Sequence, residues 1–213
     1  AGLQSGGADV IRLGQVPTPA LAFASRGRRG VMVTASHNPP TDNGLKLFVD
    51  GEEYDRELEE TIEELLVSEE SSVPWDRFGE SEQASVLSEY REAVTAYAGQ
   101  FGADPAGVRV AVDCGTGMAS VAAPQVLRAL GADVVALNAQ VDGHFPARES
   151  KPTAETLTDL RAFVRDGEFD FGIGHDGDAD RIVIVDSDGE VVHEDTVLAV
   201  VAGRYVRESA ASD

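Results

Sequence analysis

The side chains of this sequence that could do chemistry lie in two short motifs far apart along the chain. The first motif, TASHNPP at residues 34–40, places Ser36 in a turn, because Ser, Asn and Pro all favour turns. A turn holds the serine hydroxyl out from the backbone, where it can act as a nucleophile. The following residues 43–46, NGLK, add Lys46, which can donate or accept a proton.

The second motif, DGDADR at residues 176–181, supplies three carboxylates, those of Asp176, Asp178 and Asp180. Side chains two residues apart in an extended segment point the same way, so the carboxylates should gather. They would repel one another unless a divalent cation lay among them. An EF-hand calcium loop is excluded, since Arg181 and Ser187 stand where it needs Gly and Glu. Hard oxygen ligands suit Mg²⁺, and serine, lysine and metal together indicate phosphoryl transfer.

Each motif follows an apolar run that is typical of a buried strand, at residues 31–33 and 169–173. Reactive groups in open α/β sheets gather at the carboxyl ends of strands. Alternating strand and helix patterns predict an α/β fold: two layered domains with mixed, mostly parallel sheets flanked by helices. The break DPAG at 104–107 places the boundary between a domain at 1–103 and a domain at 104–213.

Hydrophobic periodicity predicts the individual elements. In the first half they are helices at 3–7, 19–25, 52–67 and 84–100 and strands at 9–13, 30–34 and 45–49, with a loop at 68–82. In the second half they are strands at 108–113, 133–137 and 169–173, a hairpin of 182–186 with 190–193, and helices at 119–130, 154–166 and 195–207. Inward-facing side chains are expected at Leu58, Ile62, Leu65 and Leu66, at Leu87, Tyr90, Val94 and Tyr97, and at the loop anchors Val73, Trp75 and Phe78.

Composition excludes several classes of protein. The formal net charge of −21 leaves no basic stripe to neutralise the phosphates of nucleic acid. No apolar run is long enough to cross a membrane, and residues 1–4 lack the pattern of a signal peptide. Cys114 is the only cysteine, which fits a reducing cytoplasm.

The acidic excess predicts a dependence of stability on salt. With 38 acidic and 17 basic residues, of which only Lys46 and Lys151 are lysines, the chain is typical of halophilic proteins. The Debye length falls from about 30 Å at 0.01 M salt to about 3 Å at 1 M, so KCl should screen the self-repulsion. We expect the melting temperature to climb markedly between low and molar KCl. A flat curve would rule out adaptation to high salt.

The two motifs resemble those of the α-D-phosphohexomutases, which include phosphomannomutase, phosphoglucomutase and phosphoglucosamine mutase, and the whole sequence looks haloarchaeal. VPTP at 16–19, GHFP at 143–146 and KP at 151–152 also resemble family segments, in the same order. Ala179 stands where the family motif usually has glycine. The resemblance implies a Mg²⁺-dependent isomerase that moves a phosphoryl group within a hexose phosphate, between the 1- and 6-positions, through a bisphosphate intermediate.

The resemblance also implies a role for each site residue. Ser36 would carry the phosphoryl group and ligate the metal through its phosphate, beside Asp176, Asp178 and Asp180. Lys46 would be the general acid and base, with a pKa lowered toward neutrality, and Arg181 would bridge to the serine phosphate. His37 could be a phosphate neighbour, a substrate contact or a turn scaffold, and loop shaping falls to Asn38, Asn43 and Gly44.

Other functions remain open on the sequence. A metal-dependent sugar-phosphate phosphatase would use the same serine but transfer the phosphoryl group to water. A module that binds a metal or a sugar phosphate without catalysis is the other alternative, and the presence of both Ser36 and Lys46 argues against it. The choice among mannose, glucose and glucosamine phosphates is equally open.

These enzymes have four domains, and the resemblance covers only part of the first domain and the second domain. The chain alone is therefore expected to bind Mg²⁺ weakly and to isomerise no hexose phosphate at a useful rate, since positioning is most of phosphoryl-transfer catalysis. An open sheet edge should also make the first half looser than the second.

Overall fold

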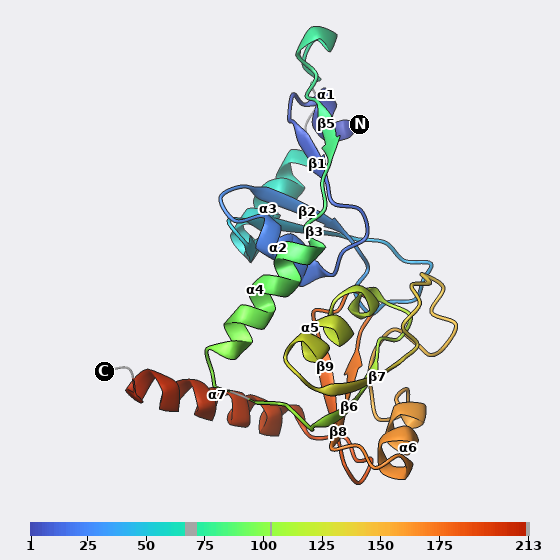
Figure 1. Cartoon of the computed structure of the whole chain (residues 1–213). Coiled ribbons are helices and arrows are strands. Elements are labelled where there is room, and N and C mark those ends of the chain that lie inside the picture. The colour runs from blue at the N-terminus through green and yellow to red at the C-terminus, as the bar shows by residue number, and fades with distance from the viewer. Residues whose placement is uncertain (67–71, 103, 212–213) are drawn as a thin grey trace.

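The second half of the chain is built on a four-stranded sheet (Figure 1). The strand order is β7-β6-β8-β9, from β6 (Arg109–Asp113), β7 (Asp133–Leu137), β8 (Phe171–His175) and β9 (Ile182–Asp186). Strand β6 runs parallel to both β7 and β8, whereas β9 is antiparallel to β8. The computed structural model, which describes residues 1–66, 72–102 and 104–211, thus confirms the α/β class predicted from the alternating pattern.

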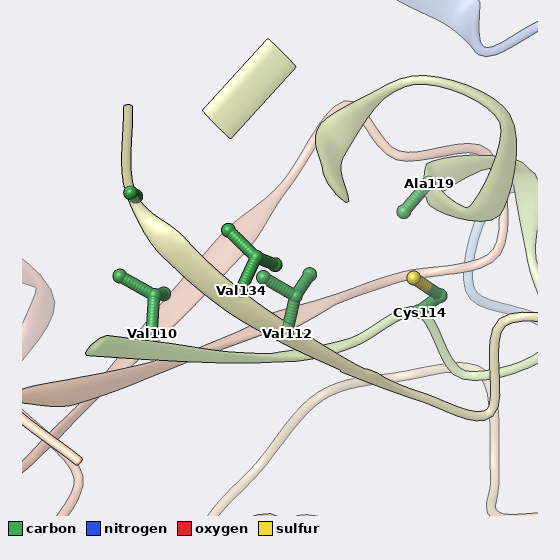
Figure 2. Close-up of a cluster of buried hydrophobic side chains, with 6 residues drawn as sticks. Val110, Val112, Cys114, Ala119 and Val134 are labelled. Carbon is green, nitrogen blue, oxygen red and sulfur yellow. The ribbon is translucent and has the colours of Figure 1, made fainter. Parts of the chain in front are cut away.

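Side chains on the two faces of this sheet form two cores. On one face Val110, Val112 and Cys114 pack with Val134 and with Ala119 of the 3₁₀ turn Met118–Val121, beside α5 (Ala123–Ala129) (Figure 2). On the other face Ala111 and Val185 pack against Leu160 and Val164 of α6 (Thr158–Asp166). Burying each such valine or leucine contributes roughly 1.5–3 kcal/mol. The sheet edge that carries the aspartates is therefore held between two packed layers.

The first half contains two smaller sheets. One pairs β1 (Val10–Arg12) in parallel with β5 (Ser81–Gln83), and the other is antiparallel, in the order β2 (Arg29–Val33), β3 (Leu45–Val49), β4 (Glu52–Glu53). Helix α2 (Thr18–Ala24) packs on β2 and β3 through Ala20, Leu21 and Phe48. The other edges of β1 and β2 carry no strand among the described residues.

Several predicted elements differ in the structure. Residues 81–83 form β5 instead of a loop, a strand that hydrophobic periodicity cannot reveal because its side chains are polar and exposed. The helix predicted from residue 52 begins later, as α3 (Arg56–Leu66), since Glu52 and Glu53 pair with β3. The second hairpin strand at 190–193 is reduced to a single bridge between Val185 and Val191. Residues 67–71, at the end of the predicted helix and in the predicted loop, lie outside the described residues.

Some side chains predicted to be buried are exposed. Leu58, Leu65 and Leu66 of α3 keep 39, 59 and 77% of their surface exposed, and Trp75 keeps 84%. Phe78 and Tyr97 are also about half exposed. Periodicity predicts the apolar face of a helix, but it does not say whether another element packs on that face. The prediction of burial was therefore wrong for these six side chains, whereas Ile62 and Val73 are half-buried.

Helix α4 (Leu87–Gly99) spans the two halves (Figure 1). The ring of Tyr90 meets Phe23 of α2 edge-on at 6.0 Å, and the Arg91 guanidinium donates to the carbonyl oxygen of Val121 at 2.8 Å. The domain division at 103/104 stays a prediction. Helices α1 (Gly2–Ser5) and α7 (Glu194–Ala211) lie near the ends of the chain. Within the described ranges, no helix has the length and apolar character to span a bilayer.

Candidate active site

The two sequence motifs lie side by side at strand ends. The Ser36 loop, residues 34–40, follows the carboxyl end of β2, and the aspartate loop, residues 176–180, follows that of β8. A Cβ built on Gly177 would lie 3.0 Å from the Ser36 carbonyl oxygen and 2.9 Å from Cζ of Phe145. Glycine at 177 is therefore what lets the backbones of these two loops approach so closely.

Ser36 occupies a strained turn beside a cleft. Its φ of 55° is left-handed, which costs a serine roughly 1–2 kcal/mol, and such strain gathers at functional sites. The Ser36 amide donates to the Thr34 hydroxyl at 2.9 Å, and the Ser36 Oγ lies 3.3 Å from the His37 Nδ1. The cleft has a volume of about 620 Å³, and Ser36 and Asp178 both line it. The turn thus presents the hydroxyl to a space that a ligand could enter.

The three aspartates form a compact group of oxygens. One carboxylate oxygen from each of Asp176, Asp178 and Asp180 lies within 4.8 Å of the others. Asp176 Oδ2 and Asp178 Oδ1 are buried and have no hydrogen-bond partner among the described residues. Burial, followed by the charges of Asp178 and Asp180, raises the pKa of Asp176 to about 7. Carboxylate oxygens that lie close together and lack hydrogen-bond partners are suitable ligands for a divalent cation such as Mg²⁺.

Hydrogen bonds from Thr18 and Met118 hold the aspartate loop, residues 176–180, in place. The Thr18 hydroxyl donates to Asp178 Oδ2 at 2.8 Å, and the Thr18 amide donates to the Asp178 carbonyl oxygen at 2.9 Å. The Met118 amide donates to the Gly177 carbonyl oxygen at 2.9 Å, and Ala179 adopts a left-handed φ of 60°. Thr18 lies in the VPTP segment, but its role depends on contacts across the sheets that local sequence does not reveal.

Lys46 lies on β3, and its ammonium faces the aspartates. Lys46 Nζ is 3.3 Å from Asp178 Oδ2 and 2.5 Å from Asp180 Oδ2. Burial disfavours the charged form, but the hydrogen bonds and charges of Asp180 and Asp178 outweigh burial and raise the pKa of Lys46 above its ordinary value. The expected lowering is therefore not what this arrangement gives. A divalent cation held by the same carboxylates would counter the charges that cause the rise.

Arg181 and His37 lie at the margin of the site. Arg181 Nε is 3.8 Å from Asp176 Oδ2 and 3.8 Å from Asp180 Oδ1, and its side chain is half exposed. Its bridge to a serine phosphate stays a prediction. Burial, then the positive charges of Arg181 and Lys151, lowers the pKa of His37. A neutral imidazole can accept a hydrogen bond at Nδ1 from the Ser36 hydroxyl.

The residues predicted to shape the loop differ in their contacts. The Asn38 side-chain amide donates to Asp42 Oδ2 at 3.2 Å, and Asn43 lines the cleft. The Thr34 amide donates to the Gly44 carbonyl oxygen at 3.0 Å. A Cβ on Gly44 would lie 2.8 Å from the Thr34 carbonyl oxygen, so only glycine fits where the two ends of the loop meet.

Comparison with known proteins decides the family. Two models described as phosphoglucomutase/phosphomannomutase match this chain, alpha/beta/alpha domain I over residues 1–72 and alpha/beta/alpha domain II over residues 88–189. The chain belongs to the phosphoglucomutase/phosphomannomutase family. The membership predicted from the serine and aspartate motifs is therefore confirmed.

Relatives in this phosphoglucomutase/phosphomannomutase family carry different substrates in their names. A phosphopentomutase from Thermococcus kodakarensis is 42% identical over 98% of this chain and 46% of its own length. A probable phosphoglucosamine mutase from Methanopyrus kandleri is 41% identical, with 98% and 46% coverage. The crystal structure of a putative phosphomannomutase from Thermus thermophilus superposes with a TM-score of 0.84 at 28% identity, covering 97% of this chain and 48% of that one. The chain spans about half the length of the curated relatives it matches.

A third loop of this phosphoglucomutase/phosphomannomutase chain, residues 143–152, contacts both motif loops, and neither Arg148 nor Ser150 in it was predicted as a site residue. Arg148 Nε lies 2.8 Å from Asp113 Oδ2, and the two side chains are almost fully buried. The hydroxyl of Ser150, two residues on, reaches both motif loops. The flanking segments GHFP and KP, which carry Pro146 and Pro152, were the sequence signal that this region mattered.

Proposed function

We propose that this chain carries the phosphoryl-transfer centre of an isomerase that moves a phosphoryl group between two hydroxyls of a hexose phosphate. The observation that supports this most is the close approach of the Ser36 loop to the aspartate loop, in which Asp176 and Asp178 are buried and each has a carboxylate oxygen without a hydrogen-bond partner. A serine alone fits many roles, and carboxylates alone fit any divalent cation. Their proximity, with Lys46 paired to Asp178 and Asp180, fits transfer from a phosphoserine.

In this proposal Asp176, Asp178 and Asp180 hold Mg²⁺, which when bound neutralises charge on the transferred phosphoryl group. The bond between phosphorus and Ser36 Oγ breaks as a free sugar hydroxyl forms a new bond to phosphorus. Lys46 in its neutral form would accept the proton of that hydroxyl; this form requires bound Mg²⁺ to offset the aspartate charges that otherwise keep the ammonium protonated. The resulting bisphosphate turns over, and its other phosphoryl group returns to Ser36 while Lys46 gives back the proton. Arg181 adds positive charge beside the phosphate.

The substrate proposed here is a hexose phosphate, and its bisphosphate is the intermediate. Relatives are named for glucosamine, glucose, mannose and pentose phosphates, so a pentose phosphate is the first alternative to assay. Cytoplasmic location and function in concentrated salt stay predictions from composition.

Mass spectrometry tests the proposal directly. A protein of the relatives' full length that contains these residues is incubated with glucose 1,6-bisphosphate, with and without Mg²⁺, and its peptides are analysed for phosphate. We expect one phosphate, on Ser36, that accumulates only with Mg²⁺ and is absent from Ser36→Ala. Ser25→Ala is the matched control, because Ser25 is also a serine with a backbone hydrogen bond but lies away from the site.

Two results would contradict the proposal. Lack of phosphate on Ser36, in that full-length protein shown to bind Mg²⁺, would favour a non-catalytic metal-binding module. Steady release of inorganic phosphate from the labelled protein, with none returned to sugar, would favour the phosphatase.

A further inference from the structure

We propose that Ser150 is a positioning residue that couples the aspartate loop to the Ser36 loop. This inference rests on the proposed function, since it concerns how the two halves of that site are held in register. Ser150 lies in the third loop, between GHFP and the predicted helix, and neither motif contains it.

The Ser150 hydroxyl hydrogen-bonds both loops. It accepts from the Gly177 amide at 3.1 Å and donates to the Ser36 carbonyl oxygen at 3.2 Å. A hydroxyl has one proton to donate, and here that proton is committed to the Ser36 loop. Only 6% of Ser150 is exposed, so water has little access to replace either bond. The side chain therefore links the backbone next to Asp176 with the backbone of the proposed nucleophile.

The third loop is itself rigidly held. Arg148 pairs with Asp113, and their side chains are only 6% and 2% exposed. Asp113 also accepts from the Gly115 amide at 2.8 Å and from the Asn138 side chain at 3.0 Å. A buried ion pair whose groups are all hydrogen-bonded fixes its surroundings. Ser150, two residues from Arg148, is thus anchored to the ends of β6 and β7.

Arg148 and Ser150 hydrogen-bond the backbone of the aspartate loop on either side of Asp176. Arg148 Nη2 donates to the carbonyl oxygen of His175 at 2.5 Å, and Ser150 accepts from the amide of Gly177. Any ordering of Asp176 by a cation is therefore transmitted to Ser150 and, through its hydroxyl proton, to Ser36. Positioning of this kind matters because small displacements of reacting groups cost much of the rate of phosphoryl transfer.

The test compares Ser150→Ala with wild type and with Ser25→Ala. Ser25 is also buried, at 1% exposed, and its hydroxyl donates to one carbonyl oxygen within α2. Mg²⁺ affinity is measured by calorimetry. Hydrogen exchange of a peptide covering residues 34–38 is measured with and without Mg²⁺, a readout that a merely structural serine would not move.

In wild type and Ser25→Ala, Mg²⁺ should slow exchange in residues 34–38. In Ser150→Ala, Mg²⁺ should bind about fivefold more weakly, the worth of one neutral hydrogen bond. At saturating Mg²⁺ the slowing at residues 34–38 should be lost. Ser150→Cys, which keeps a weak donor and acceptor in place, should recover part of it.

If Mg²⁺ slowed hydrogen exchange at residues 34–38 in a folded Ser150→Ala chain as much as in wild type, the proposed coupling would be wrong. It would also be wrong if wild-type protein bound Mg²⁺ without slowing of exchange at residues 34–38, and that result would leave the proposed metal site standing. Wild-type protein with no affinity for Mg²⁺ would instead remove the proposed function and the coupling together.

Discussion

Replacing Ser36 with alanine should abolish turnover while leaving the fold intact. In a protein of the relatives' full length that contains these residues, we expect Ser36→Ala to lower turnover at least about a thousandfold, or about 4 kcal/mol of transition-state stabilisation. The reason is that alanine offers no oxygen to carry the phosphoryl group. A coupled assay with glucose, mannose, glucosamine and pentose phosphates measures the loss and identifies the substrate.

The same substitution should barely change the melting temperature. Ser36 lies in a loop beside the cleft, and the contact of its hydroxyl is with His37 at 3.3 Å. Alanine keeps the Ser36 amide and carbonyl oxygen, which bond Thr34 and Ser150. Ser25→Ala should show the reverse pattern, with some loss of stability and normal turnover. Near-normal turnover in Ser36→Ala would end the phosphoserine mechanism.

Much of the fold could be predicted from the sequence because its signals are local. Strands β3 and β7 have the predicted bounds, since each is an apolar run closed by turn residues or charges. Helix α2 begins and ends within one residue of its predicted bounds. Strand β5 was missed because its three exposed residues are strand only through their pairing with β1. The start of α3 shifted because Glu52 and Glu53 pair with β3, which periodicity does not indicate.

The sequence also predicted the part of the candidate site that lies in short local motifs, but not the residues outside them. Ser36 and the aspartates belong to short contiguous patterns, whose chemistry can be read from residue type and spacing. Thr18, Arg148 and Ser150 act through hydrogen bonds to loops far away in sequence, so no local pattern indicates them. Even the raised pKa of Lys46 follows from its distance to Asp180, which only the fold sets.

Asp176 and Asp113 are both buried, but the loss of each carboxylate should have opposite effects on stability. The pKa of Asp176 is raised to about 7, chiefly by burial and then by Asp178 and Asp180, against an ordinary 3.8. The folded chain therefore binds this proton more tightly than the unfolded chain does, and stability falls as pH rises from about 4 to about 7. Above that window the ionised carboxylate costs on the order of a few kcal/mol unless a cation offsets it. Asp113 is equally buried, but Arg148 already neutralises it.

Asp176→Asn should accordingly raise the melting temperature at pH 8 without Mg²⁺. Between pH 4 and 7, the melting temperature of Asp176→Asn should decrease less with rising pH than that of wild type. Asp113→Asn, the matched control, should lower the melting temperature, because this substitution leaves the buried Arg148 charge unpaired. Mg²⁺ should stabilise wild type but scarcely Asp176→Asn, whose affinity should drop by more than about 100-fold, beyond the usual effect of outer-shell changes. Differential scanning fluorimetry in molar KCl, which screens the net charge of −21, measures all three proteins. An unchanged Mg²⁺ response in Asp176→Asn, or a loss of stability without Mg²⁺ like that of Asp113→Asn, would show that Asp176 is a structural carboxylate and not a metal ligand.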